Sequence, residues 1–144
     1  MDIIIDFDGT CVTHEFPEIG KDIGSDIVLK KLISHGHNLI LFTMRCDLDH
    51  SVYKNGIEIP PGKYLTEAVE WFRNKRIKLY GIQKNPLQHE WTTSTKAYGN
   101  IIIDDSSLGC PVIFDENLSD RPFVDWESVH DILQYRGFFK KPIR

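Results

Sequence analysis

Short apolar runs alternate with longer amphipathic segments along the chain. The apolar runs predict strands at residues 3–6, 39–42, 78–82, 101–103 and 111–114. Two segments, at about 22–35 and 65–76, carry apolar residues at the three- and four-residue spacing of a helix that buries one face. A last helix is expected to begin near Asp125, a residue type that caps helix N-termini. Strands that alternate with helices in this way predict an α/β fold with a mainly parallel sheet.

Polar residues stand directly after three of the predicted strands. Asp6 and Asp8 follow the first strand, Thr43 the second, and Asp104 and Asp105 the fourth. The carboxyl ends of parallel strands meet at one edge of the sheet, where ligands of open α/β sheets bind, so these side chains are expected to share a crevice. Asp6 and Asp8 point the same way on a continuing strand. Two such carboxylates repel one another, and a hard cation such as Mg²⁺ relieves the repulsion.

Length, charge and cysteine content restrict the domain organisation, the partners and the location of the protein. The 144 residues suit a single domain spanning 1–144, and 41% apolar with 26% charged residues is ordinary for a soluble globular protein. The net charge of -4 does not favour nucleic acid as a partner. The three cysteines are widely spaced and form no metal-binding or disulfide pattern. With no signal peptide and no membrane-length apolar stretch, a cytoplasmic location and no membrane partner are expected.

The residues at these strand ends resemble three motifs of the haloacid dehalogenase-like (HAD) phosphohydrolase superfamily. The segment Asp6-Phe7-Asp8-Gly9-Thr10 resembles the first motif, DxDGT. Residues 39–43 resemble the second motif, an apolar strand that ends in Thr or Ser, and residues 101–105 resemble the fourth, a strand that ends in paired Asp. The resemblance runs from residue 3 to about residue 111. It implies a Rossmann-like, HAD-type sheet flanked by helices, in one domain without a large cap.

This resemblance implies a Mg²⁺-dependent phosphatase that works through an aspartyl-phosphate. Asp6 would be the nucleophile and a metal ligand. Asp8 would protonate the leaving oxygen and then activate the hydrolytic water, while its backbone carbonyl binds the metal. Asp104 would be a further metal ligand. Asp105 would orient the site or hold a metal-bound water, a role that is compatible with capping the turn that follows.

The phosphoryl oxygens would be held by a hydroxyl and a lysine. Thr43 supplies the hydroxyl, and Lys96 is the preferred lysine because it stands shortly before the fourth predicted strand, as in nucleotidase-like members of the superfamily. Lys84, after the third predicted strand, is the alternative. Positive and hydrogen-bonding groups at these positions would stabilise the charge on the transferred phosphoryl group.

Substrate-binding roles are assigned to Gly9, Thr10 and Arg45. Gly9 and Thr10 would shape the turn that holds Asp8. Arg45 could bind a substrate anion through two parallel hydrogen bonds, and an ordinary loop arginine is the equally weighted alternative. Residues 46–63 carry the turn signals Asn55-Gly56 and are expected to form a partial lid over the site.

Three functions remain open from the sequence. The leading one is hydrolysis of a small phosphomonoester, with a nucleotide as one candidate. The first alternative is a nucleic-acid end phosphatase, which would need a basic groove that the acidic total does not favour. The second is a binding or regulatory module that keeps the HAD fold without turnover, although the retained Asp8 and Asp104 speak against it. A receiver-like domain ranks lower, because its phosphoacceptor Asp ends a middle strand and does not open the chain.

Overall fold

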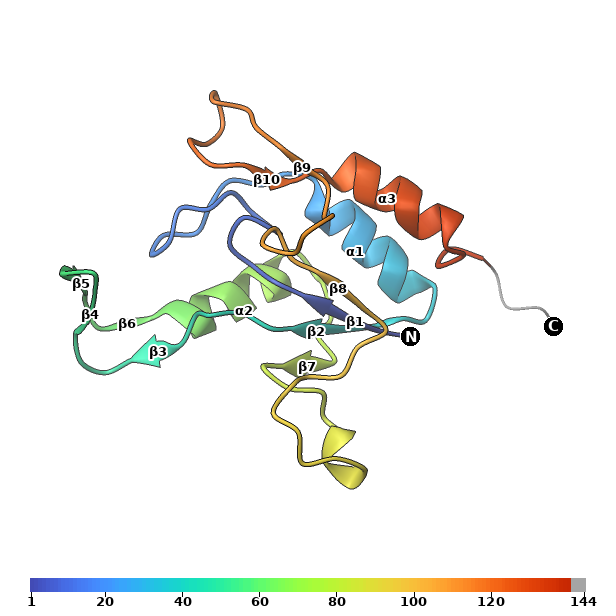
Figure 1. Ribbon diagram of the computed structural model, residues 1–144, viewed down its shortest axis with the longest axis horizontal. Helices are drawn as coiled ribbons and strands as arrows, with labels where there is room; N and C mark the ends of the chain where they lie inside the picture. Colours follow the sequence, from blue (N-terminus) through green and yellow to red (C-terminus); the bar gives the residue numbers. More distant parts are fainter. Residues whose placement is uncertain (141–144) are drawn as a thin grey trace.

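Four parallel strands form the central sheet of the computed structural model, which describes residues 1–140 (Figure 1). Their order across the sheet is β7 (Gly81–Ile82), β2 (Asn38–Leu41), β1 (Asp2–Ile5) and β8 (Ile101–Ile103). Ile3 of β1 pairs with Leu39 of β2 on one side and with Ile101 of β8 on the other. The carboxyl ends of all four strands therefore lie at one edge, on the left of Figure 1.

Three helices supply the main hydrophobic core on one face of this sheet. They are α1 (Ser25–Ser34), α2 (Tyr64–Asn74) and α3 (Trp126–Tyr135). Ile3 and Ile5 of β1 point into this core with Leu39 and Leu41 of β2, because alternate strand residues share a face. Asp125 caps α3 by accepting a hydrogen bond from the backbone N–H of Ser128, as the sequence predicts. The predicted α/β architecture with a parallel sheet is thus confirmed.

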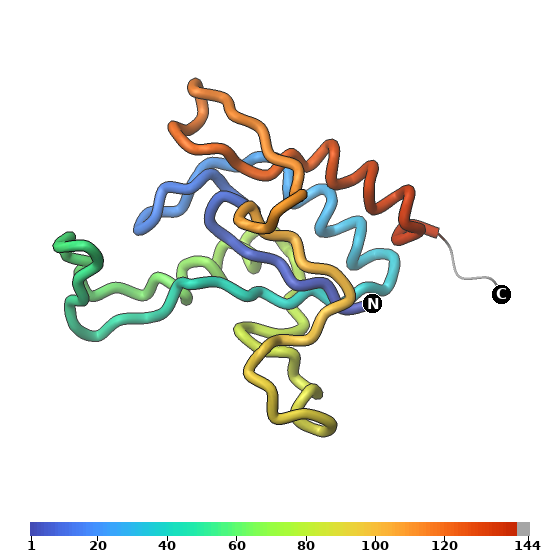
Figure 2. The backbone as a smooth tube through the Cα atoms, in the orientation of Figure 1, coloured from blue at the N-terminus to red at the C-terminus, as the bar shows by residue number. Residues whose placement is uncertain are grey.

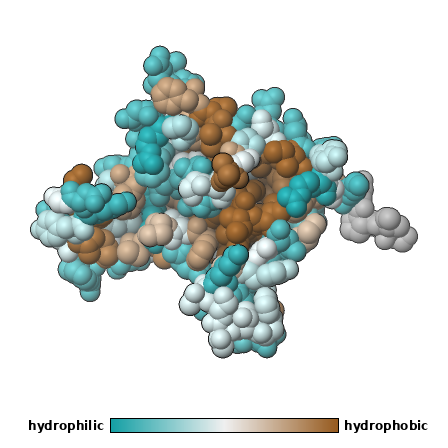
Figure 3. Space-filling model, in the orientation of Figure 1, coloured by the Kyte–Doolittle hydropathy of each residue, from teal (hydrophilic) through white to brown (hydrophobic). Residues whose placement is uncertain are grey.

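The opposite face of the sheet has a much thinner cover. Ile4 and Ile40 point to this face and pack against Ala97 and Tyr80, which belong to loops. The segment 83–100 crosses it with a single 3-10 turn, η1 (Gln88–Glu90), and no α-helix. Ile102 of β8 stays 50% exposed. Figure 3 shows the resulting hydrophobic surface in the middle of the view, over β8.

Residues 46–63 form an extended arm beyond the carboxyl edge of the sheet (Figure 2). Four short strands build it, namely β3 (Asp47–Leu48), β4 (Val52–Lys54), β5 (Ile57–Ile59) and β6 (Gly62–Lys63). The outer hairpin β4–β5 turns at Asn55 and Gly56, both with positive φ, which is the backbone that an Asn-Gly hairpin turn requires. Strands β3 and β6 pair antiparallel at the base. The region expected as a loop is therefore an ordered β arm, and its role as a lid stays a prediction.

The predicted fifth strand exists but lies outside the main sheet. Val112–Ile113 (β9) pairs antiparallel with Phe123–Val124 (β10), and neither joins β8. The backbone N–H of Val124 donates to the carbonyl of Gly9, so this small sheet is tied to the loop after β1. Within residues 1–140, no helix has the length and apolar character needed to cross a membrane.

Candidate active site

Three carboxylates from two neighbouring strands gather at the carboxyl edge. Asp6 directly follows β1, and Asp104 and Asp105 directly follow β8. One oxygen from each of the three lies within 4.8 Å of the other two. The parallel, in-register pairing of β1 with β8 explains this meeting, because it brings the two strand ends to the same level. The side chain of Asp8 is not part of the cluster.

Gly9 and Thr10 pack the loop after β1 against Asp105. Gly9 has φ of +78°, and a Cβ there would lie 2.5 Å from Oδ2 of Asp105, so only glycine allows this approach. The hydroxyl of Thr10 lies 2.9 Å from an Asp6 oxygen and 3.1 Å from an Asp105 oxygen, and it accepts a hydrogen bond from the backbone N–H of Asp105 at 3.0 Å. Both residues are buried. The contacts of Gly9 and Thr10 hold the carboxylates in place, and neither of these two residues is open to a substrate.

Asp6 is the most strongly perturbed acid of the cluster. Its pKa is raised from 3.8 to about 8, mainly by burial and next by the nearby charge of Asp104. Hydrogen bonds from the backbone of Phe7 and from the Thr10 hydroxyl act in the opposite direction. Burial disfavours the charged form of a carboxyl, and a like charge adds to that cost. Without a cation, Asp6 therefore holds its proton to a higher pH than an ordinary carboxyl group does.

Asp8 points to a different partner, the guanidinium of Arg45. Nε of Arg45 donates to one Asp8 oxygen and Nη2 donates to the other, each at 2.8 Å. The Arg45 side chain is only 1% exposed. A guanidinium buried in this way does not present itself to a substrate anion, so the role expected for Arg45 is corrected. The pair joins residues 37 apart in sequence, and no local sequence signal predicts it.

Thr43 is held in place by Gln83, a residue that the sequence analysis missed. The Gln83 side chain accepts from the backbone N–H of Thr43 at 2.8 Å and donates to its carbonyl at 2.7 Å. Gln83 stands directly after β7 and has φ of +63°. Its position at a strand end is the one signal that could have marked it. The Thr43 hydroxyl accepts from the backbone N–H of Arg45, which leaves its own hydrogen available as a donor.

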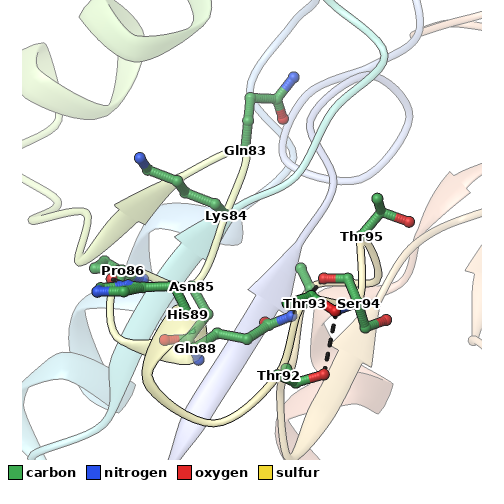
Figure 4. A pocket seen from close by; sticks show the side chains of 11 residues that line it. Gln83, Lys84, Asn85, Pro86, Gln88, His89, Thr92, Thr93, Ser94 and Thr95 are labelled. Atoms are coloured by element: carbon green, nitrogen blue, oxygen red, sulfur yellow. Dashed lines mark hydrogen bonds between the residues drawn. The ribbon is translucent and has the colours of Figure 1, made fainter.

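The two candidate lysines lie at different places in the fold. Lys84 follows Gln83 and lines a hollow of about 450 Å³ together with the segment Thr92–Thr95 (Figure 4). In that view its side chain extends away from Thr95. Lys96 precedes Ala97, which packs on the second face of the sheet. Lys84 stands two residues beyond the carboxyl end of β7. Among residues 1–140, neither lysine forms a salt bridge with a carboxylate, so the choice of Lys96 over Lys84 stays a prediction.

The chemistry of the cluster fits a hard divalent cation. All three donors are carboxylates, and the oxygen-only ligand set is the one that Mg²⁺ takes in proteins. Within the described part of the chain, no Lys or Arg side chain pairs with Asp6, Asp104 or Asp105. The charge of Asp104 contributes to the raised pKa of Asp6, and a bound cation would relieve this repulsion. The predicted backbone ligand, the carbonyl of Asp8, stays a prediction.

Comparison with known proteins adds a fold relative and no activity. No family model matches the chain, and no curated protein matches it. A solved structure from Bacteroides thetaiotaomicron is similar, with 29% sequence identity and a TM-score of 0.68 over 94% of this chain and 91% of that one. It is described as a conserved protein coded by a locus of that organism. The likeness therefore supports the fold and leaves the chemistry to be argued from the site.

Proposed function

We propose that this protein is a Mg²⁺-dependent phosphohydrolase with a Rossmann-like, HAD-type sheet. The observation that carries the proposal is the meeting of Asp6 with Asp104 and Asp105 at the ends of adjacent parallel strands. From β1 the sheet continues to β2 on one side and to β8 on the other, so the order of strands switches beside Asp6. Ligands of open α/β sheets bind at such a switch point.

The reaction proceeds by two displacements at phosphorus. The Asp6 carboxylate attacks, the bond from phosphorus to the leaving oxygen breaks, and the leaving oxygen takes a proton from Asp8. A water molecule then attacks the aspartyl-phosphate and gives a proton to Asp8. The bond between phosphorus and the Asp6 oxygen breaks, which releases inorganic phosphate and restores both carboxyl groups.

Other groups of the site stabilise and hold the phosphoryl group. Asp6, Asp104 and Asp105 would hold Mg²⁺, which would supply positive charge beside the phosphoryl oxygens. The Thr43 hydroxyl donates to a phosphoryl oxygen, with Lys84 or Lys96 as the cationic partner. This arrangement supplies the electrostatic stabilisation on which phosphoryl transfer depends.

The proposed substrate is a small phosphomonoester, with a nucleotide as one candidate. The arm lies at the same edge of the sheet as the carboxylates (Figure 1). Its Tyr53 is 70% exposed, so the ring is free to contact a base or a sugar. Aromatic side chains with an apolar face and a polar tip are suited to such contacts. The net charge of -4 gives no support to a nucleic-acid end as the substrate.

A phosphatase screen tests the proposal directly. Nucleotides, sugar phosphates and 5′- and 3′-phosphorylated oligonucleotides are incubated with the protein, with Mg²⁺ and with EDTA, and released phosphate is measured. We expect Mg²⁺-dependent turnover of at least one small phosphomonoester. We also expect Asp6→Asn to lower kcat by roughly a thousandfold or more, the scale on which loss of a nucleophile acts.

Asp120→Asn serves as the matched control, because Asp120 is an exposed acid far from these strand ends in sequence. It should keep wild-type activity. If the wild-type protein turns over none of the substrates and binds no Mg²⁺, the enzymatic proposal is wrong. If Asp6→Asn keeps wild-type activity, the phosphatase proposal stands but the nucleophile is another residue. Preference for the oligonucleotides would favour the nucleic-acid end phosphatase.

A further inference from the structure

We propose that Arg45 is a positioning residue for Asp8 and that it links Asp8 to both ends of the arm. The inference rests on the proposed function, in which Asp8 transfers protons, and it names the device that sets the place of that carboxyl group. The sequence assigned Arg45 to the substrate, whereas the geometry points to an action through Asp8.

Every hydrogen-bond donor of the Arg45 guanidinium is engaged. Nε and Nη2 donate to the two oxygens of Asp8, and the second hydrogen of Nη2 reaches the carbonyl of Glu18 at 2.8 Å. Nη1 donates to the carbonyls of Tyr64 at 3.3 Å and Pro17 at 3.4 Å. A guanidinium has five N–H donors, so none remains for a ligand. Hydrogen bonds to several separate segments of the chain therefore fix the orientation of the guanidinium.

Two aromatic rings lie close to the same guanidinium group. The central carbon of the guanidinium lies 5.2 Å from the centre of the Phe7 ring and 5.1 Å from that of Phe16. The guanidinium cation is attracted to the faces of both rings, and this attraction adds to the hydrogen bonds that hold it in place. A side chain fixed in this way can act as a rigid support for the carboxylate that it binds.

The Asp8 carboxylate is held by this support and still keeps room to react. Its side chain is 12% exposed, against 1% for Arg45, so the open side of the pair is the Asp8 side. Each carboxylate oxygen has two lone pairs, and Arg45 uses one on each oxygen. The bidentate geometry restricts rotation of the carboxyl group, so removing Arg45 would free Asp8 to take other rotamers.

The contacts also join Asp8 to the arm. Arg45 stands two residues before β3, where the arm begins, and its Nη1 binds the carbonyl of Tyr64, which directly follows β6. Both ends of the arm therefore meet at one guanidinium. A displacement of the base of the arm moves Arg45, and the bidentate pair passes that displacement to Asp8. Proton transfer by Asp8 thus depends on the position of the base of the arm.

A double-mutant cycle tests this inference. Arg45→Met, Asp8→Asn and the double variant are compared with wild type on p-nitrophenyl phosphate, whose leaving group needs no proton, and on an alkyl phosphate, whose leaving group does. If Arg45 acts through Asp8, Arg45→Met lowers kcat/KM on the alkyl ester by on the order of a hundredfold, within the range of general acid catalysis. The ratio kcat/KM ends at departure of the leaving group, so it excludes the hydrolysis of the aspartyl-phosphate that both esters share. The loss on the nitrophenyl ester is at least tenfold smaller. In the Asp8→Asn background, Arg45→Met causes no further loss.

Arg45→Lys keeps the positive charge but not the bidentate geometry, so it should restore part of the lost alkyl-ester activity. If thermal melting shows that Arg45→Met does not fold, Arg45→Lys takes its place in the double-mutant cycle. Equal losses on both esters, or losses that multiply in the double variant, would show a purely structural role and overturn the inference while leaving the phosphatase proposal intact. A wild-type protein without any turnover would overturn the phosphatase proposal, and this inference with it.

Discussion

Raising the pH should destabilise the metal-free protein through Asp6. Its pKa is raised from 3.8 to about 8 by burial and by the charge of Asp104. Between these two pH values the folded state holds a proton that the unfolded state has lost, so the free energy of unfolding falls as the pH rises. One pKa unit corresponds to about 1.36 kcal/mol, which sets an upper limit of about 6 kcal/mol for the whole interval. Above about pH 8 both states are ionised and the loss is complete.

The comparison with Asp6→Asn isolates this contribution. Asparagine keeps an oxygen for the Thr10 hydroxyl but carries no charge at any pH. In urea unfolding with EDTA present, the free energy of unfolding of Asp6→Asn should rise relative to that of wild type by up to about 3 kcal/mol between about pH 5.5 and about pH 8.5. Asp120→Asn, the exposed control, should follow wild type throughout. If wild type and Asp6→Asn keep a constant difference over this range, burial and Asp104 do not perturb Asp6, and the electrostatic account of the site is wrong.

Mg²⁺ should reverse the effect at the alkaline end. A cation bound by the ionised cluster must displace the Asp6 proton, so its affinity rises with pH up to about 8. At a concentration one hundred times its Kd, a ligand of the folded state alone adds about 2.7 kcal/mol of stability. Stabilisation by a fixed Mg²⁺ concentration should therefore be larger at about pH 8.5 than at about pH 5.5, and Asp6→Asn should abolish this dependence. Equal stabilisation at the two pH values would place the metal elsewhere.

Two further variants examine single contacts of the site. Lys84→Ala should raise KM or lower kcat more than Lys96→Ala, because Lys84 stands beside Gln83 at the carboxyl edge, whereas Lys96 precedes the residue packed on the second face. Steady-state kinetics with the best substrate measures this ranking. The reverse ranking would return the phosphate-binding role to Lys96. Thr10→Val should lower the free energy of unfolding in urea by about 1–3 kcal/mol, because it leaves the partly buried N–H of Asp105 without its acceptor. Unchanged stability would mean that another group replaces the hydroxyl.

The parts of the site that lie at strand ends were accessible from the sequence. An apolar run marks a buried strand, and the polar residue that follows it marks the end of that strand. Asp6 and Asp104 could be brought together on this basis alone, because parallel pairing is a general property of α/β sheets and places the carboxyl ends at one edge. The structure confirms that these two residues meet.

The parts that depend on packing between distant segments were not accessible. Arg45 and Asp8 are 37 residues apart, and nothing in the local pattern distinguishes an arginine that binds a substrate from one that binds an aspartate. The Asn55-Gly56 turn could be read from the sequence, but the pairing of β3 with β6 at the base of the arm could not. Both features depend on the meeting of the two ends of the arm, which a pattern of hydrophobicity does not encode.

The direction in which the chain crosses the sheet explains why the cover is uneven and where the site lies. The steps from β1 to β2 and from β2 to β7 go the same way across the sheet, so right-handed crossovers put α1 and α2 on one face. The step from β7 to β8 goes back past β1, and the same handedness sends segment 83–100 over the other face. That segment has no α-helix and leaves Ile102 half exposed. The three carboxylates gather where β1 and β8 end side by side, at the edge from which the loops after these two strands leave. The return past β1 that leaves one face thinly covered is thus also the step that places β8 beside β1 and brings their carboxylates together.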